Sequence, residues 1–194
     1  MTHSHRVFGI AGWKNSGKTT LVTALVSEFV RRGYRVSTVK HAHHEFDIDT
    51  PGKDSHRHRV SGANEVLVAS GTRWALMHEM RDEPAPSLSE LLAHLAPCDL
   101  VLVEGFKRDR HQKLEVVRAN AKEPPIANTD PSIIALATDS PNLFPQHKTL
   151  PLNDIKTIAD FITQKCALAK RKSEKRFEPS SRLVAPSTHG YKVT

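Results

Sequence analysis

Cysteine is scarce in this chain, and no long apolar run occurs in it. The 194 residues include two cysteines, Cys98 and Cys166, which lie far apart and outside any CxxC pattern. That spacing argues against a disulfide framework or a cysteine-rich zinc site and favours the cytoplasm as the location. No run is long enough to cross a bilayer, and the first residues lack the apolar stretch of a secretory signal.

The net charge of +7 is concentrated at one end of the chain. Seven basic and two acidic residues lie between Ala167 and Thr194, so this segment carries +5 and the residues before it only +2. The segment is also aperiodic and contains prolines, a composition typical of disorder. We therefore predict a folded domain over residues 1–166 and a disordered basic tail over residues 167–194. The small net charge of the predicted folded domain gives little support to nucleic-acid binding by that domain.

Apolar, β-branched runs alternate with helical patterns before this tail. Helices are predicted over residues 17–32, 53–60, 87–95 and 153–167, and the third begins with a capping box formed by Ser87 and Glu90. Strands are predicted over residues 6–11, 34–40, 65–69, 72–78, 99–105, 114–118 and 133–137. The alternation predicts one α/β domain of the P-loop NTPase type, with a largely parallel sheet flanked by helices.

The segment from Gly12 to Thr20 matches the phosphate-loop motif G-x-x-x-x-G-K-[ST] at every fixed position. Glycines allow backbone N–H groups to curl around phosphate oxygens, and the following helix presents its N-terminus to the anion. Lys18 would place a cation near the β- and γ-phosphates, and Thr19 would offer its hydroxyl to Mg²⁺. Because the motif follows a predicted strand and opens a predicted helix, it predicts a nucleoside triphosphate site.

A second strand end supplies a candidate metal ligand. Phosphate-loop proteins usually hold the magnesium shell with an acid at the end of a neighbouring buried strand. The apolar run from Leu100 to Val103 ends at Glu104, with Glu in place of the usual Asp, whereas Asp99 begins the strand and would point away. We predict that Thr19 and Glu104 hold the metal. The alternative is that Glu104 merely ends a strand beside Gly105.

The segment of residues 40–59 holds five of the twelve histidines. It follows a predicted strand, so it starts at the same edge of the sheet as the phosphate loop, where such proteins often sense the γ-phosphate. Together with Asp47, Asp49 and Asp54 the histidines form a candidate metal site. Their spacing lacks the helical H-x-x-x-H pattern of a preformed zinc site, so a solvated polar loop is the favoured interpretation.

Four stretches of the sequence together carry a family resemblance. They are GWKNSGKTTL from Gly12, KHAHHEFDID from Lys40, PGKD from Pro51 and DLVLVEGFK from Asp99. Together they resemble the molybdopterin-guanine dinucleotide biosynthesis adapter (MobB) family. The phosphate loop is shared by many families, but its occurrence together with the other three, in this order and spacing, is far more specific. The resemblance covers about residues 6–165 and does not extend to the tail.

The resemblance implies a GTP-binding homodimer that hydrolyses GTP weakly at best. Such a protein works beside the guanylyltransferase that attaches GMP to molybdopterin, as an adapter or GTP supplier. Asp54 and the histidine segment would then face the γ-phosphate or molybdopterin, which makes Asp54 the catalytic candidate. Thr19 and Glu104 would serve Mg²⁺. The implied phosphate ligands, beyond Gly12, are Lys14, Asn15, Ser16, Gly17, Lys18, Thr19 and Thr20.

Guanine recognition has two candidate carboxylates, because the N-K-x-D loop of many GTPases is absent. Asp130 lies in an Asn-Thr-Asp sequence, and Asp139 follows the predicted strand 133–137. Either could accept hydrogen bonds from guanine N1–H and N2–H₂. Asp139 is preferred for its position after a strand, although a turn aspartate before Pro141 is an equal alternative.

Three other functions fit parts of the sequence. A P-loop small-molecule kinase would prefer ATP and transfer a phosphoryl group to an acceptor. A nickel-insertion GTPase would use the histidine segment as a metal store. A nucleic-acid binder would act through the basic tail, with steep salt dependence. The hairpin-like stretch of residues 65–78 is a candidate dimer edge, although edge strands are as often simply protected.

Overall fold

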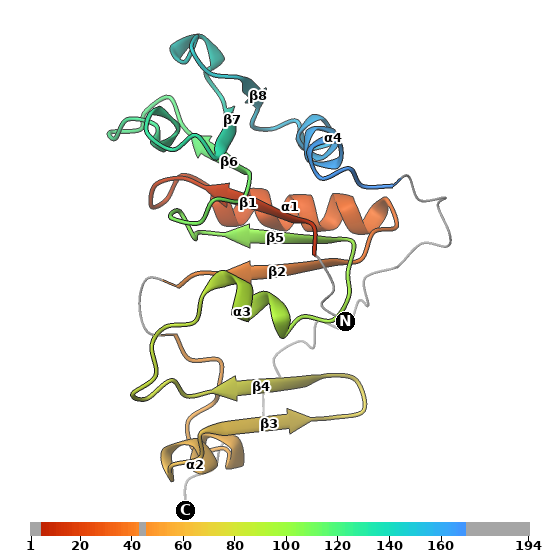
Figure 1. The fold of residues 1–194 in the computed structure, drawn as a ribbon, viewed down its shortest axis with the longest axis vertical. Helices are drawn as coiled ribbons and strands as arrows, with labels where there is room; N and C mark the ends of the chain where they lie inside the picture. Colours follow the sequence, from red (N-terminus) through yellow and green to blue (C-terminus); the bar gives the residue numbers. More distant parts are fainter. Residues whose placement is uncertain (1–4, 43–45, 170–194) are drawn as a thin grey trace, which may run out of the picture.

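Six parallel strands form the central sheet, in the order β2-β5-β1-β6-β7-β8. The computed structural model describes residues 5–42 and 46–169. The strands are β1 (Val7–Ala11), β2 (Val36–Lys40), β5 (Leu100–Glu104), β6 (Lys113–Val117), β7 (Ile133–Thr138) and β8 (Thr149–Pro151). Because all six run in the same direction, their carboxyl ends meet at one edge of the sheet, on the left in Figure 1.

Four α-helices and two short 3₁₀ helices connect or follow these strands. They are α1 (Lys18–Arg31), α2 (Asp54–Val60), α3 (Leu88–Ala93), α4 (Ile155–Lys165), η1 (Ile126–Asn128) and η2 (Pro141–Leu143). The predicted capping box at the start of α3 is confirmed, since the Ser87 and Glu90 side chains each bond the other's backbone N–H. The α/β class and the parallel sheet predicted from the sequence are confirmed as well.

Helices cover the sheet on both faces. On one face α1 and α4 bury Leu25, Phe29 and Ile158 against sheet residues such as Phe8 and Leu102. On the other face α3 places Leu88 against Val101 and Val103 of β5. Strand β5 is therefore buried along its whole length, which is why its sequence is a continuous apolar run instead of an alternating one.

Strands β3 (Glu65–Ala69) and β4 (Trp74–His78) form a separate antiparallel hairpin. Residue 67 pairs with residue 76, and residue 69 with residue 74. The hairpin lies beyond β2 in Figure 1, with α2 packed against β3. The hairpin shares no strand pairing with the central sheet. The sequence predicted both of its strands but did not predict that they form a separate sheet.

Two features of the C-terminal part differ from the predictions. Strand β8 was not predicted, because its three residues, Thr149 to Pro151, are too few to show a period. The fold also continues past the predicted domain end at residue 166. Leu168 is buried in the core, and the Tyr34 hydroxyl donates to the Ala169 carbonyl. The remainder of the predicted tail, residues 170–194, lies outside the described residues.

The described helices are too short or too polar to cross a membrane.

Candidate functional site

The segment from Gly12 to Gly17 forms a loop between the carboxyl end of β1 and the N-terminus of α1. Both end positions require glycine. Gly12 has a φ of 141°, and a Cβ there would lie 2.8 Å from the Val116 carbonyl. Gly17 has a φ of 103°, and a Cβ there would lie 3.2 Å from Arg118 Nη2. The glycines therefore allow the tight path of the loop, and the first N–H groups of α1 face the space above it.

Lys18 begins α1 and lies over the loop. Its ammonium donates a hydrogen bond of 2.8 Å to the Trp13 carbonyl. Burial lowers the pKa of Lys18, Glu104 raises it, and the ammonium groups of Lys107 and Lys40 lower it further. The net shift of the Lys18 pKa is downward, chiefly because burial disfavours the charged ammonium, and the two neighbouring cations add to it. A polyphosphate placed beside Lys18 would supply compensating negative charge.

Thr19 and Glu104 meet beside the loop, as the sequence predicted. The Thr19 hydroxyl donates to Glu104 Oε1 at 2.9 Å, and this carboxylate is nearly buried at the end of β5. Lys40 Nζ, at the end of β2, lies 4.0 Å from the same oxygen. A hydroxyl and a carboxylate are hard oxygen donors, the set that Mg²⁺ prefers next to phosphate. The residues present therefore fit the predicted metal.

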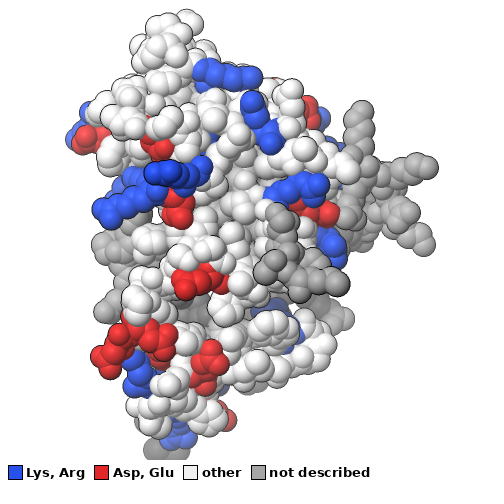
Figure 2. All heavy atoms as spheres, in the orientation of Figure 1, with Lys and Arg blue, Asp and Glu red and all other residues white. Residues whose placement is uncertain are grey.

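Basic side chains gather at this edge of the molecule. Figure 2 shows lysine and arginine at the left of the view, at the level of the carboxyl ends of β1 and β5, with acidic residues gathered lower down near the end of β4. Lys40 was not assigned to the nucleotide site from the sequence, whereas Lys107, in the VEGFK stretch, was a candidate for charge near the γ-phosphate. Both lie close to the loop, because Lys40 Nζ is 4.0 Å from Glu104 Oε1 and Lys107 Nζ is 4.3 Å from the Trp13 ring centroid. The site is therefore suited to a polyanion.

The two guanine candidates lie at opposite edges of the sheet. Asp139 follows β7 directly, at the same edge as the loop. Asp130 precedes β7, and its carboxylate accepts from Ser132 Oγ at 2.6 Å and lies 3.5 Å from the buried Lys113 ammonium. Asp130 is therefore held at the amino edge of the sheet, away from the carboxyl edge where the loop lies. Of the two candidates, Asp139 is the one at the edge of the loop.

The Asp139 carboxylate is held by the end of β6. Its Oδ1 accepts from the Ala119 N–H at 3.0 Å, and its Oδ2 accepts from Arg118 Nη1 at 3.3 Å. Burial alone would raise the pKa of Asp139, but these hydrogen bonds outweigh it and hold the pKa below its usual range. Asp139 is therefore ionised at neutral pH. Nothing in the sequence motif had singled out Arg118, although it lies at the end of a predicted strand.

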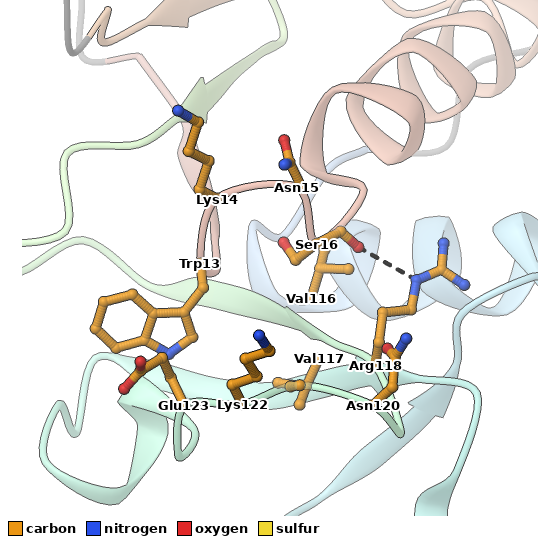
Figure 3. Close-up of a pocket in the computed structure, with 11 residues that line it drawn as sticks. Trp13, Lys14, Asn15, Ser16, Val116, Val117, Arg118, Asn120, Lys122 and Glu123 are labelled. Carbon is orange, nitrogen blue, oxygen red and sulfur yellow. Dashed lines mark hydrogen bonds between the residues drawn. The ribbon is translucent and has the colours of Figure 1, made fainter.

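A cavity of about 370 Å³ lies beside the loop, between it and the segment that follows β6. Its lining, drawn in Figure 3, includes Trp13 and Lys14 from the loop and Arg118, Lys122 and Glu123 from the segment after β6. The Trp13 indole donates to the Pro124 carbonyl at 3.0 Å, and Lys107 Nζ lies 4.3 Å from the ring centroid. These contacts fix the aromatic side chain of the loop.

The remaining loop residues divide into exposed and buried groups. Lys14, Asn15 and Thr20 are exposed, and Asn15 has a φ of 62°, which turns the backbone over the loop. The Ser16 hydroxyl is buried without a hydrogen-bond partner beside Gly12. The Ser16 N–H donates to the Trp13 carbonyl at 3.3 Å within the loop, and the Ser16 side chain packs beneath the loop.

Asp54 lies apart from the phosphate loop in this structure. It is exposed in the first turn of α2, which packs against β3 at the far end of the long axis in Figure 1. Among the described residues it forms no hydrogen bond or ion pair with the loop. Residues 43–45 of the histidine segment lie outside the described residues, and the described part contains no group of three metal-ligating side chains.

The chain is similar to a known family along most of its length. The family model for molybdopterin guanine dinucleotide synthesis protein B, MobB, matches residues 7–139. The molybdopterin-guanine dinucleotide biosynthesis adapter protein of Escherichia coli (strain K12) is 40% identical over 162 residues, which is 81% of this chain and 91% of that protein. The Haemophilus influenzae protein of the same description is 39% identical over 165 residues, covering 84% of this chain and 90% of that protein.

A solved structure shares the fold. The crystal structure of a MobB protein homolog from Bacillus stearothermophilus superposes with a TM-score of 0.62 at 29% sequence identity. The match covers 84% of this chain and 98% of that one. The overall fold of this chain is therefore one already seen by experiment.

Proposed function

The chain belongs to the molybdopterin guanine dinucleotide synthesis protein B family, and from this premise we propose that it is a GTP-binding adapter in molybdenum cofactor biosynthesis. It would assist the guanylyltransferase that joins GMP to molybdopterin. The observation that carries the nucleotide part is the hydrogen bond between Thr19 and Glu104 beside a complete phosphate loop. The adapter part rests on the relatives, whose descriptions name that role.

Each part of a GTP–Mg²⁺ complex has a matching group in the site. Backbone N–H groups of the loop and the start of α1 would hold the phosphates, and Lys18 would neutralise the β- and γ-phosphates. Thr19 and Glu104 would hold Mg²⁺, which bridges phosphate oxygens and neutralises their charge. The Asp139 carboxylate would accept hydrogen bonds from guanine N1–H and N2–H₂.

We expect hydrolysis of GTP to be slow in the isolated protomer. Fast hydrolysis needs a side chain that orients the attacking water, or an arginine at the γ-phosphate. Asp54, the candidate from the sequence, lies on α2 away from the loop. A catalytic role for Asp54 therefore requires α2 to approach the loop, from the same chain or from a second copy. If Asp54 takes that role, Asp54→Asn will lower the rate of hydrolysis and leave GTP affinity unchanged.

Glu104→Gln is expected to weaken the magnesium dependence of GTP binding. The amide keeps the size of the carboxylate but loses the negative charge that supports Mg²⁺ and balances Lys18. A loss of about 1.4 kcal/mol in the metal interaction would raise the magnesium concentration at half-saturation about tenfold. Titrating Mg²⁺ into protein with saturating GTP measures this midpoint. An unchanged midpoint would remove Glu104 from the metal site.

The proposed partners are the guanylyltransferase, molybdopterin and a second copy of this chain. An adapter must contact both the enzyme and its substrates, and the exposed apolar face of the hairpin offers a surface for a second copy. Because free GTP and the synthesis of the cofactor belong to the cell interior, we propose a cytoplasmic location. The net charge of only +2 on residues 1–166 gives no support to nucleic acid as a partner of the folded domain.

Calorimetric titration with GTP and with ATP, each with Mg²⁺, tests the proposed function. We expect a clear preference for GTP. A second assay adds the protein to the guanylyltransferase, molybdopterin and a limiting amount of GTP, and measures the yield of the guanine dinucleotide. A preference for ATP would favour a small-molecule kinase, and stoichiometric nickel binding with no effect on dinucleotide yield would favour a nickel-insertion GTPase.

A further inference from the structure

The side chain of Arg118 contacts two parts of the site at once. Its Nε donates to the Ser16 carbonyl in the phosphate loop at 3.3 Å, as Figure 3 shows, and its Nη1 donates to Asp139 Oδ2 at 3.3 Å. The next residue, Ala119, donates its N–H to Asp139 Oδ1 at 3.0 Å. Two consecutive residues at the end of β6 therefore hold both oxygens of one carboxylate and the backbone of the loop.

This arrangement depends on the shape of a guanidinium group. Its N–H donors point in fixed directions within one plane, so Nε and Nη1 can serve two acceptors at once. A lysine ammonium at this position could approach either acceptor but has no rigid fork. The loop also leaves room for the group, because a Cβ on Gly17 would lie 3.2 Å from Nη2. Arg118 and Gly17 thus fit together at the start of α1.

The position of Asp139 suits the edge of a purine. Strand β7 lies two strands from β1, which corresponds to about 10 Å at the usual strand spacing. A nucleotide with its phosphates on the loop would extend in that direction to bring its base to Asp139. Guanine presents N1–H and N2–H₂ side by side, and only a carboxylate with a fixed plane can accept from both. Each Asp139 oxygen has a further lone pair beyond the one already used.

We propose that Arg118 is a positioning residue for guanine specificity, because it orients the Asp139 carboxylate relative to the phosphate loop. The inference rests on the proposed function, in which the loop binds GTP. Without Arg118 the carboxylate keeps only backbone N–H donors, from Ala119 and from Asp139 itself, and loses the side-chain donor that fixes its second oxygen. Recognition of the base then weakens more than recognition of the phosphates. The same contact ties the loop carbonyl of Ser16 to the end of β7 through Asp139.

The test compares GTP with inosine triphosphate, which lacks the N2 amino group and so forms one hydrogen bond fewer with a carboxylate. Dissociation constants are measured for both nucleotides in wild type, Arg118→Met, Arg118→Lys and a control, Arg35→Met. Arg35 is an exposed arginine next to the start of β2, at the opposite edge of the sheet, so the control removes the same charge away from the site.

We expect Arg118→Met to lower the preference for GTP over inosine triphosphate at least fivefold. Arg118→Lys should lower it less, and Arg35→Met should leave it unchanged. A merely structural role predicts equal losses for both nucleotides and an unchanged ratio, and that result would overturn the inference. Unchanged affinities for both nucleotides would overturn it too. Because Arg118 is partly exposed and methionine keeps its aliphatic stem, the variant should fold, which thermal unfolding will check.

Asp139→Asn separates failure of this inference from failure of the proposed function. An asparagine amide can donate to the 2-oxo group of xanthine, so this variant should prefer xanthosine triphosphate over GTP. If wild type prefers GTP over ATP but Asp139→Asn does not change its preference, Asp139 does not contact the base and the inference about Arg118 is wrong. If wild type shows no preference for GTP over ATP, the proposed function itself fails.

Discussion

Replacing Lys18 with alanine is expected to weaken GTP binding by at least about a hundredfold while leaving the fold intact. The Lys18 ammonium lies over the loop, 2.8 Å from the Trp13 carbonyl, and its removal would leave the β- and γ-phosphates without the cation of the motif. Truncating one member of a desolvated, hydrogen-bonded charge pair costs about 3 kcal/mol, which corresponds to the stated loss. Calorimetry with GTP and Mg²⁺ measures it directly.

The fold should survive this substitution because Lys18 contributes little to the core. Its side chain donates a hydrogen bond to the Trp13 carbonyl within the loop, and it is not part of the hydrophobic clusters of the described residues. Lys165→Ala, in the last turn of α4 at the other end of the sheet, removes the same charge and should keep full GTP affinity. If Lys18→Ala binds GTP as wild type does, the phosphate loop is not the nucleotide site.

The wild-type affinity should also depend on pH through Lys18. Burial and the neighbouring ammonium groups lower its pKa in the free protein, and a bound polyphosphate raises the pKa again. Binding therefore favours the protonated form. GTP affinity should be constant below the pKa of the free protein and fall as the pH rises above it. Lys18→Ala should lack this part of the pH dependence.

The phosphate side of the site could be predicted from the sequence because each of its residues is tied to a strand or helix end. A parallel sheet brings the carboxyl ends of its strands to one edge. Once β1 and β5 were recognised as buried strands, Thr19 and Glu104 had to lie near each other if those strands were neighbours. The strands β1 and β5 are neighbours in the sheet, and Ile10 pairs with Glu104. The phosphate-loop motif and the strand order of the sheet therefore place Thr19 and Glu104 side by side.

The polar contacts around β6 and β7 could not be predicted in the same way, because they join segments that are distant in the sequence. Lys113 and Glu115 would be taken for solvent-facing charges of strand β6, yet both are fully buried. Glu115 accepts the N–H groups of Ile126 and Ala127 at the start of η1, and burial raises its pKa. These polar contacts are set by tertiary structure, so alternation of residue types along the strand gives no sign of them.

Asp130 and Asp139 show the same limit. Both are aspartates near one strand, and the sequence favoured Asp139 only for its position after the strand. The structure separates them because Lys113 and Ser132 hold Asp130 at the amino edge, while Ala119 and Arg118 hold Asp139 at the loop edge. Arg118 was not singled out because a single arginine at a strand end has no motif around it.

The hairpin is expected to mediate a homodimer, and charged substitutions on one of its faces should produce monomers. Leu67 and Leu76 are directly opposite each other, and Trp74 is opposite Ala69 on the same face. The exposed fraction is 62% for Leu67, 40% for Leu76 and 66% for Trp74. A two-stranded sheet is marginal by itself, and an exposed apolar stripe of this kind marks an interface. A two-fold axis would bring the same face of a second copy against it.

Leu67→Asp together with Trp74→Asp should convert the dimer into a monomer in sedimentation equilibrium, because burying two carboxylates against apolar partners costs more than the interface can supply. Leu143→Asp is the matched control, since Leu143 is a comparably exposed leucine on η2, outside the hairpin, and the dimer should persist. A monomeric wild type, or a dimer that survives the double substitution, would rule out this interface.

Since the phosphate loop is complete within one chain, the monomer should keep its GTP affinity within a few-fold. A rate of hydrolysis that falls on dissociation would then indicate that Asp54 acts across the interface.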